Sequence, residues 1–155
     1  MTEIHRTNLR FLLQLKGSIG ILNNLIHDNL ALMAIAHFEA VYRGLECTYT
    51  NAGASGIDIV GKDRSGVVKL LAEVKTTLPD RHGRIRGPQS KHIEKDLDRL
   101  AASKGDMLRY LVLLSSSTKK AVQKQLGTDS SFPNVKIFNA FEEQLSEIEN
   151  PEDVV

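Results

Sequence analysis

Two carboxylates and one ammonium group stand in the best-formed apolar part of the sequence. The segment SGIDIVGKDRSGVVKLLAEVKTT, residues 55–77, has two apolar stretches around a turn signal, and it contains Asp58, Glu73 and Lys75. If residues 65–66 form a two-residue hairpin loop, counting back along both strands places Asp58 opposite Glu73. Because side chains alternate along a strand, Glu73 and Lys75 then share one face with Asp58.

Two carboxylates on neighbouring strands need a counter-charge. Cross-strand neighbours lie about 5 Å apart, and at that distance carboxylates repel each other unless a proton or a cation lies between them. An oxygen-only ligand set suits Mg²⁺ or Mn²⁺, which bind one or two carboxylates and complete their shell with water and phosphate oxygens. The alternative is structural: Lys75 neutralises both acids on a solvated face, where an exposed ion pair contributes about 0–1 kcal/mol.

The elements around this hairpin follow from hydrophobic spacing. The first 44 residues predict one or two helices that end near Gly44, because Ala31, Ile35 and Phe38 recur at the spacing of a helix lying on a sheet. Strands are predicted for LECTYT, both arms of the hairpin, MLRYLVLLSS and VKIF. Helices are predicted from near Ser90 to Gly105, with Ser90 as N-cap, and over STKKAVQKQLG and FEEQLSEIEN.

This order of elements predicts the fold class. The hairpin turns its second face, with Ile57, Ile59, Leu70, Ala72 and Val74, toward the core. Three strands in a meander, followed by alternating helices and strands, predict an α/β fold with a mixed central β-sheet and helices on both faces. A chain of 155 residues is long enough for one such domain, which we expect to span residues 1–155.

The composition excludes several classes of protein. A single cysteine, Cys47, rules out an internal disulfide and a thiolate zinc cluster. The sequence shows neither a signal-peptide pattern nor an uninterrupted apolar run of roughly 20 residues, so we expect a cytoplasmic protein without a membrane span. A net charge of +1 means that any binding of a polyanion depends on local clustering.

The densest basic stretch follows the hairpin directly, over residues 81–95. It contains four candidates for contacts with nucleic-acid phosphates, Arg81, Arg84, Arg86 and Lys91. The alternative is an ordinary solvated loop, as most charged runs are.

The hairpin also resembles a known motif. GIDIV followed by LLAEVKTT is similar to the motif of the PD-(D/E)XK nuclease superfamily, which has the restriction-endonuclease-like fold. In that family the first acid stands at the start of the second strand and a Glu-x-Lys element lies in the third, which match Asp58, Glu73 and Lys75. Gly and Ile replace the family's nominal Pro before the acid, and the resemblance covers roughly residues 30–115.

The resemblance implies a restriction-endonuclease-like core and Mg²⁺-dependent hydrolysis of DNA phosphodiester bonds. Asp58, Glu73 and the backbone carbonyl of Val74 would hold the metal, and Lys75 would orient the attacking water or stabilise charge on the phosphate. Cutting both strands of a duplex needs two sites, so a homodimer is expected.

Two helpers and two rival functions complete these expectations. The family often has a Glu on its first helix, for which Glu39 is the candidate and Asp28 a weaker one, and Gln89 matches a Gln that points toward the site in some members.

A Holliday-junction resolvase has the same fold, and KGS at residues 16–18 resembles its early basic motif, although the Glu expected soon afterwards is missing. The other rival is a non-catalytic nucleic-acid-binding or interaction domain.

Overall fold

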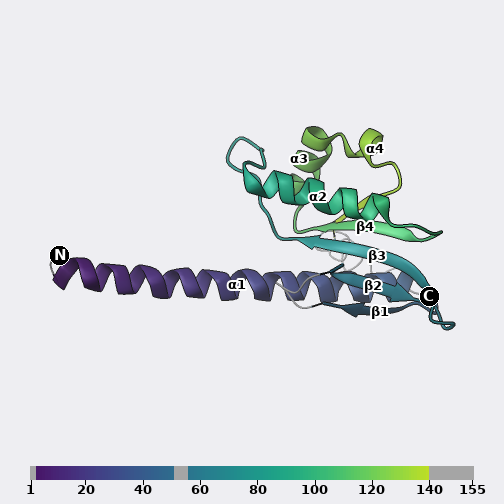
Figure 1. Ribbon diagram of the computed structural model, residues 1–155, viewed down its shortest axis with the longest axis horizontal. Helices are drawn as coiled ribbons and strands as arrows, with labels where there is room; N and C mark the ends of the chain where they lie inside the picture. Colours follow the sequence, from purple (N-terminus) through teal and green to yellow (C-terminus); the bar gives the residue numbers. More distant parts are fainter. Residues whose placement is uncertain (1–2, 51–55, 140–155) are drawn as a thin grey trace, which may run out of the picture.

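A five-stranded mixed sheet forms the centre of the computed structural model, which describes residues 3–50 and 56–139 (Figure 1). The strands lie in the order β1-β2-β3-β4-β5, and β1, β2 and β3 form an antiparallel meander. β4 pairs parallel with β3, and β5 pairs parallel with β4. The mixed sheet is therefore confirmed. The strands are β1 (Glu46–Tyr49), β2 (Ile59–Lys62), β3 (Val68–Lys75), β4 (Leu108–Leu113) and β5 (Lys136–Asn139).

Helices cover both faces of the sheet, as predicted. On one face, the C-terminal half of α1 (Glu3–Val41) packs Leu30, Ala34 and Phe38 against the sheet. On the other face lie α2 (Pro88–Ala102) and α3 (Ser116–Leu126), and a short helix, α4 (Thr128–Ser131), precedes β5. Parallel neighbours need a crossover connection, which α2 supplies between β3 and β4, and α3 with α4 between β4 and β5.

α1 is a single helix, and its N-terminal part projects far beyond the sheet (Figure 1). Gly17 and Gly20 do not interrupt it, and it ends at Val41, close to Gly44, whose φ of 83° suits a residue without a side chain. By length and composition alone, the 24 residues Ser18–Val41 are apolar enough to cross a membrane, which the sequence analysis did not anticipate.

The hairpin turn is longer than the predicted two-residue loop. The backbone N–H of Asp63 donates to Val67 at 3.0 Å, and the Asp63 carboxylate accepts from the backbone N–H groups of Ser65 and Val67. A β-bulge compensates for this difference, because the register shifts by one residue at positions 61–62.

Beyond the bulge, Ile59 pairs with Ala72, so the next residues outward are Asp58 and Glu73. Their opposition is therefore as predicted, although the turn that leads to it is not.

Three finer predictions need correction or fall outside the described residues. Ile57 packs against the α2 side of the sheet, not with Ile59 under α1, because it precedes β2 and does not follow the alternation of the strand. Ser90 does not cap α2, since the helix begins earlier, with Pro88 at its first turn after Gly87. The helix predicted over FEEQLSEIEN lies outside the described residues.

Candidate active site

The three predicted residues meet where β2 begins and β3 ends. The backbone N–H of Val74 donates to Asp58 Oδ2 at 2.8 Å, so the Asp58 carboxylate takes the place of a strand carbonyl just before the start of β2. Glu73 and Lys75 point to the α2 face, because they alternate with Ala72 and Val74, which pack under α1. The alternation of side chains had predicted that Asp58 lies on the same face as Glu73. Asp58 instead lies between the two faces of the sheet.

The two carboxyl groups share a hydrogen bond and titrate as a pair. Glu73 is only 1% exposed, and its burial, the nearby charge of Asp58 and their mutual hydrogen bond raise the pKa of Glu73 to about 8. Burial acts to raise the pKa of Asp58 too, but hydrogen bonds from His27, Val74 and Glu73 outweigh it and lower the pKa. Near neutral pH, Glu73 therefore holds a proton that it donates to an ionised Asp58.

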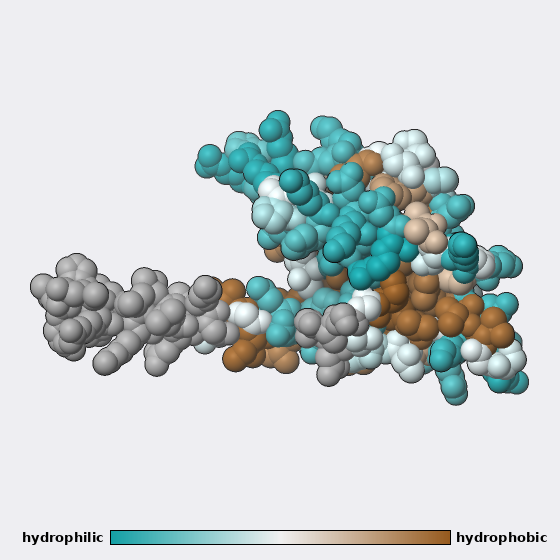
Figure 2. Space-filling view, viewed as in Figure 1, coloured by the Kyte–Doolittle hydropathy of each residue, from teal (hydrophilic) through white to brown (hydrophobic). Residues whose placement is uncertain are grey.

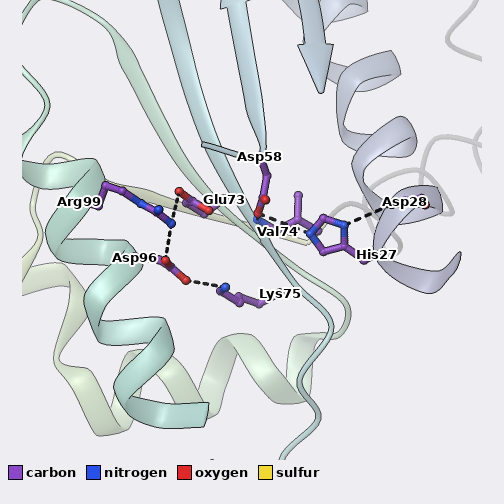
Figure 3. A network of polar contacts seen from close by, with 8 residues as sticks. All are labelled: His27, Asp28, Asp58, Glu73, Val74, Lys75, Asp96 and Arg99. Atoms are coloured by element: carbon purple, nitrogen blue, oxygen red, sulfur yellow. Dashed lines mark hydrogen bonds and ion pairs between the residues drawn. The ribbon is translucent and has the colours of Figure 1, made fainter. Parts of the chain in front are cut away.

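Two residues of α2 hold the Glu-x-Lys element from the other side (Figure 3). Lys75 Nζ lies 2.5 Å from Asp96 Oδ2, and Arg99 Nη2 lies 2.7 Å from Glu73 Oε1 and 2.5 Å from Asp96 Oδ1. Asp96 is buried, whereas Arg99 is partly open to solvent. An ion pair of Lys75 was the structural alternative in the sequence analysis. The structure contains one, but its partner is Asp96 and not the acids of the hairpin.

The sequence analysis missed Asp96 and Arg99, although α2 carries a signal for one of them. Asp96 falls within the apolar stripe of Ile93, Leu97 and Leu100. This stripe faces the core, so a charged residue within it is expected to be buried. A buried charge needs a partner, so an acid in that stripe predicts a basic group on the element beneath it. Lys75 on β3 is that group.

α1 closes the site with a histidine that the sequence analysis did not single out. His27 Nε2 lies 3.5 Å from Asp58 Oδ2, and His27 Nδ1 lies 3.6 Å from Asp28 Oδ1 (Figure 3). The hydrogen bond to Asp58 raises the pKa of His27, although partial burial acts in the opposite direction. Asp28, the weaker of the two candidate acids on this helix, thus reaches the site through His27.

Glu39, the preferred first-helix acid, is not brought to the site. It lies 12 residues after His27, which corresponds to roughly 18 Å along a helix. Its Oε1 accepts from the backbone N–H of Cys47 in β1 at 2.8 Å. Burial, and to a lesser degree the nearby charge of Glu39, raises the pKa of the Cys47 thiol to about 11, so this thiol is protonated at neutral pH.

An open cavity of about 450 Å³ gives access to this cluster. Asp58, Glu73 and Lys75 line it together with Val74, whose carbonyl is the predicted third metal ligand. Side chains from both helices complete the wall: Asn23, Asn24 and His27 from α1, and Gln89, His92 and Arg99 from α2. Gln89 is therefore brought to the cavity, as predicted.

The basic stretch lies in the loop between β3 and α2 and in the first turn of α2, where the surface is hydrophilic (Figure 2). Asp80 organises this loop, because it accepts from the backbone N–H of Arg84 and lies 2.5 Å from Arg86 Nε. Arg81 donates to the neighbouring imidazole. Two of the four candidate cations, Arg81 and Arg86, thus have partners within the loop, and all four are exposed, including Arg84 and Lys91.

The residues present fit a hard divalent cation. Among residues 3–50 and 56–139, no group of three or more His, Cys, Asp and Glu side chains is placed to hold a metal ion. Mg²⁺ needs only one or two carboxylates and fills its other positions with water and phosphate oxygens, so Asp58 and Glu73 suffice. The nearby charge of Asp58 helps to raise the pKa of Glu73, and a cation bound between the two carboxyl groups would remove that repulsion.

The His27 contact predicts a pH-dependent contribution to stability. Because the folded-state pKa of His27 is raised, the contribution is complete below the ordinary pKa of 6.5 and is lost as the pH rises through the raised value. We expect His27→Gln to reduce the free energy of unfolding by about 1 kcal/mol at about pH 5.5 and by much less at about pH 8.5. Urea unfolding without metal measures both.

His92→Gln is the matched control. It makes the same chemical change as His27→Gln, but at an exposed residue on the opposite wall of the cavity. An equal loss for His27→Gln at both pH values would mean that packing, not the charge on His27, supports the site.

No protein-family model matches this chain, and no curated protein is significantly similar to it. The chemistry is therefore inferred from the side chains around the cavity and from the order of the elements that carry them.

Proposed function

We propose that this protein is a Mg²⁺-dependent DNA endonuclease with a restriction-endonuclease-like core. The observation that carries the proposal is the carboxyl pair of the buried Glu73 and the partly buried Asp58, which line an open polar cavity together with Lys75. The acid at the start of the second strand and the Glu-x-Lys element on the third support it, because they follow the order that the motif resemblance requires.

Each residue at the cavity has a defined task in this proposal. Asp58, Glu73 and the Val74 carbonyl hold the metal, which when bound polarises the scissile phosphate and lowers the pKa of a bound water. Glu73 gives up the proton that it shares with Asp58 before it can serve as a ligand. Asp96 holds the Lys75 ammonium at the cavity wall, where it orients the attacking water and stabilises developing negative charge.

The cations beside the cavity supply the contacts to DNA. Arg84 and Lys91 are exposed, and phosphates are their natural partners. Arg81 and Arg86 join them by exchanging their contacts within the loop for phosphate oxygens. Gln89 lines the cavity and precedes Lys91 by two residues on α2, so it is the proposed polar contact to the phosphodiester under attack. Cleavage of both strands requires two such sites, and we propose a homodimer.

The test is incubation of the full chain with supercoiled plasmid, a four-way junction and single-stranded DNA, each with Mg²⁺ or with EDTA. We expect Mg²⁺-dependent cleavage of the plasmid. Asp58→Ala should lower the rate roughly 10³-fold or more, because loss of a metal ligand removes several kcal/mol of transition-state stabilisation. Asp98→Ala, an exposed change on α2, is the matched control and should leave the rate unchanged.

Two other outcomes replace the proposal. Cleavage confined to the junction identifies a resolvase. DNA binding without cleavage of any substrate in Mg²⁺ or Mn²⁺ identifies a binding domain.

A further inference from the structure

α1 carries an apolar surface that the described part of the chain leaves exposed. Among the residues whose side chains the structure describes, eight large apolar side chains are exposed, and five of them lie on α1 between residues 19 and 32. These five residues, each at least half exposed, are called the α1 stripe: Ile19, Ile21, Leu22, Leu25 and Leu32. Figure 2 shows hydrophobic atoms where α1 leaves the body of the protein.

The spacing of apolar residues on α1 is that of a helix that pairs with another helix. Ile19, Leu22, Ile26 and Met33 lie at the positions of such a pattern, with the polar Asn29 at the position between Ile26 and Met33, and in the sequence Leu12 and Leu15 precede them with the same spacing. This is the spacing of a coiled-coil heptad, and from Leu15 to Ile26 leucine and isoleucine occupy the alternate positions that two-stranded coiled coils favour.

The stripe continues into a groove on the body. An apolar groove of about 370 Å³ runs along α1 beside Leu114, which follows β4, and its lining includes Leu22, Leu25, Ile26 and Met33. The core residues Ala31, Ala34 and Phe38 lie on a different face of the helix and pack against the sheet. α1 therefore has one face on its own sheet. The exposed side chains of the α1 stripe lie on a second face, which borders the groove where Met33 and Leu114 pack against the core.

We propose that the α1 stripe is the contact surface for a second copy of this chain. Self-association brings identical charges together, and residues 17–26 contain no charged residue, so two copies meet there without like-charge repulsion. The inference rests on the surface of α1 alone and does not depend on the proposed cleavage.

The exposed area is close to what a stable dimer needs. Burying a whole Leu or Ile side chain removes on the order of 100 Å² of apolar surface from water. The five half-exposed side chains therefore offer roughly 250 Å² in each copy, and roughly 500 Å² in a pair of copies. Because apolar atoms form a little over half of an interface, the total is about 900 Å², near the roughly 1,000 Å² of a specific contact. Leu12 and Leu15 extend the same pattern.

A second copy fits α1 better than a lipid bilayer does. Leu30, Ala34 and Phe38 belong to the candidate membrane span Ser18–Val41, yet they are buried under the sheet, so insertion would dismantle that half of the core. Asn23, Asn24 and His27 of the same span line the polar cavity. A partner helix on the α1 stripe leaves both of these faces as they are.

The test is light scattering and sedimentation of the full chain over a range of concentrations. We expect the wild type to have twice the mass of one chain and a melting temperature that rises with concentration. Leu22→Glu/Leu25→Glu should have the mass of one chain and a melting temperature independent of concentration. Val67→Glu, a matched change of an exposed apolar residue in the hairpin turn, should remain a dimer.

Three results would overturn the inference. These are a wild type that stays a single chain at tens of micromolar, a dimer that persists in the double variant, and a single chain that instead sediments with phosphatidylcholine–phosphatidylglycerol vesicles. Far-ultraviolet circular dichroism confirms that the double variant is folded, and because both substituted side chains are exposed, the core should be unaffected. The cleavage assay has a separate readout, so failure of one proposal leaves the other standing.

Discussion

Glu73→Gln is expected to make the metal-free protein more stable near pH 8 and to abolish Mg²⁺-dependent cleavage. The pKa of Glu73 is raised to about 8 in the folded state, so its protonated form supports the fold. That contribution is complete below the ordinary pKa of 4.5 and is lost as the pH rises through about 8. Glutamine keeps the hydrogen bond to Asp58 and never ionises, so the variant avoids the loss.

The expected gain in the free energy of unfolding is about 2 kcal/mol at about pH 8, with little change at about pH 5. The raised pKa of Glu73 alone would give a larger gain in the free energy of unfolding. The gain is smaller because the open cavity lets water solvate the ionised pair of carboxylates. Cleavage should fall roughly 10³-fold, because the amide is a far weaker ligand for Mg²⁺ than a carboxylate. Urea unfolding in EDTA at both pH values and plasmid cleavage measure the two effects.

Glu94→Gln is the matched control, since Glu94 is exposed on α2. A variant that is less stable than the wild type at pH 8 would contradict the prediction. It would mean that ionised Glu73 is held chiefly as the partner of Arg99, 2.7 Å away, and that the pair with Asp58 is secondary.

Asp96→Asn is expected to slow cleavage and to move its pH dependence in the acid direction. Asp96 holds Lys75 and Arg99, so losing its charge should lower the rate about 10- to 100-fold, as loss of a supporting residue around a metal site does. The negative charge of Asp96 also helps to raise the pKa of Glu73. Without that charge, Glu73 ionises at a lower pH, and the rising limb of the rate shifts downward by a measurable fraction of a pH unit.

The variant should also be destabilised by about 1–3 kcal/mol, because it leaves two cations without their buried partner. This figure is below that of a fully buried pair, since the Lys75 and Arg99 side chains are 24% and 41% exposed. Asp98→Asn, two residues further along α2 and exposed, serves as the control. A lower rate with an unchanged pH profile would reduce Asp96 to a structural role.

The register of the hairpin near Asp58 was predicted correctly, although the length of the turn was not. The turn is longer than expected and the bulge at residues 61–62 compensates for it. What survived both departures was the alternation of the β3 side chains between the two faces of the sheet. Both faces are buried there, because Leu70 and Ala72 pack under α1 while Leu71 and Glu73 are buried on the α2 side. Asp58 escapes this rule because it lies one residue before β2, where its carboxylate bonds to the backbone of Val74.

α1 shows the opposite case. Its apolar spacing predicted a helix on the sheet, but not where along the helix the site would lie. Glu39 was the more plausible acid by analogy, and yet the helix crosses the sheet so that His27 contacts Asp58, with Asp28 behind His27, while Glu39 lies beside β1. The crossing point depends on how α1 packs on all five strands, which no local pattern encodes.

The sequence by itself determined the gathering of Asp58, Glu73 and Lys75 and the mixed sheet that carries them, because strand alternation and turn signals act over a few residues. Only the tertiary structure decided which groups set the charge of that cluster. His27 comes from a helix on one face of the sheet, and Asp96 and Arg99 come from a helix on the other. The raised pKa of Glu73 comes first from its burial between these layers and from the charge of Asp58, and then from Asp96, while Arg99 acts in the opposite direction, so it depends on contacts that no local pattern encodes.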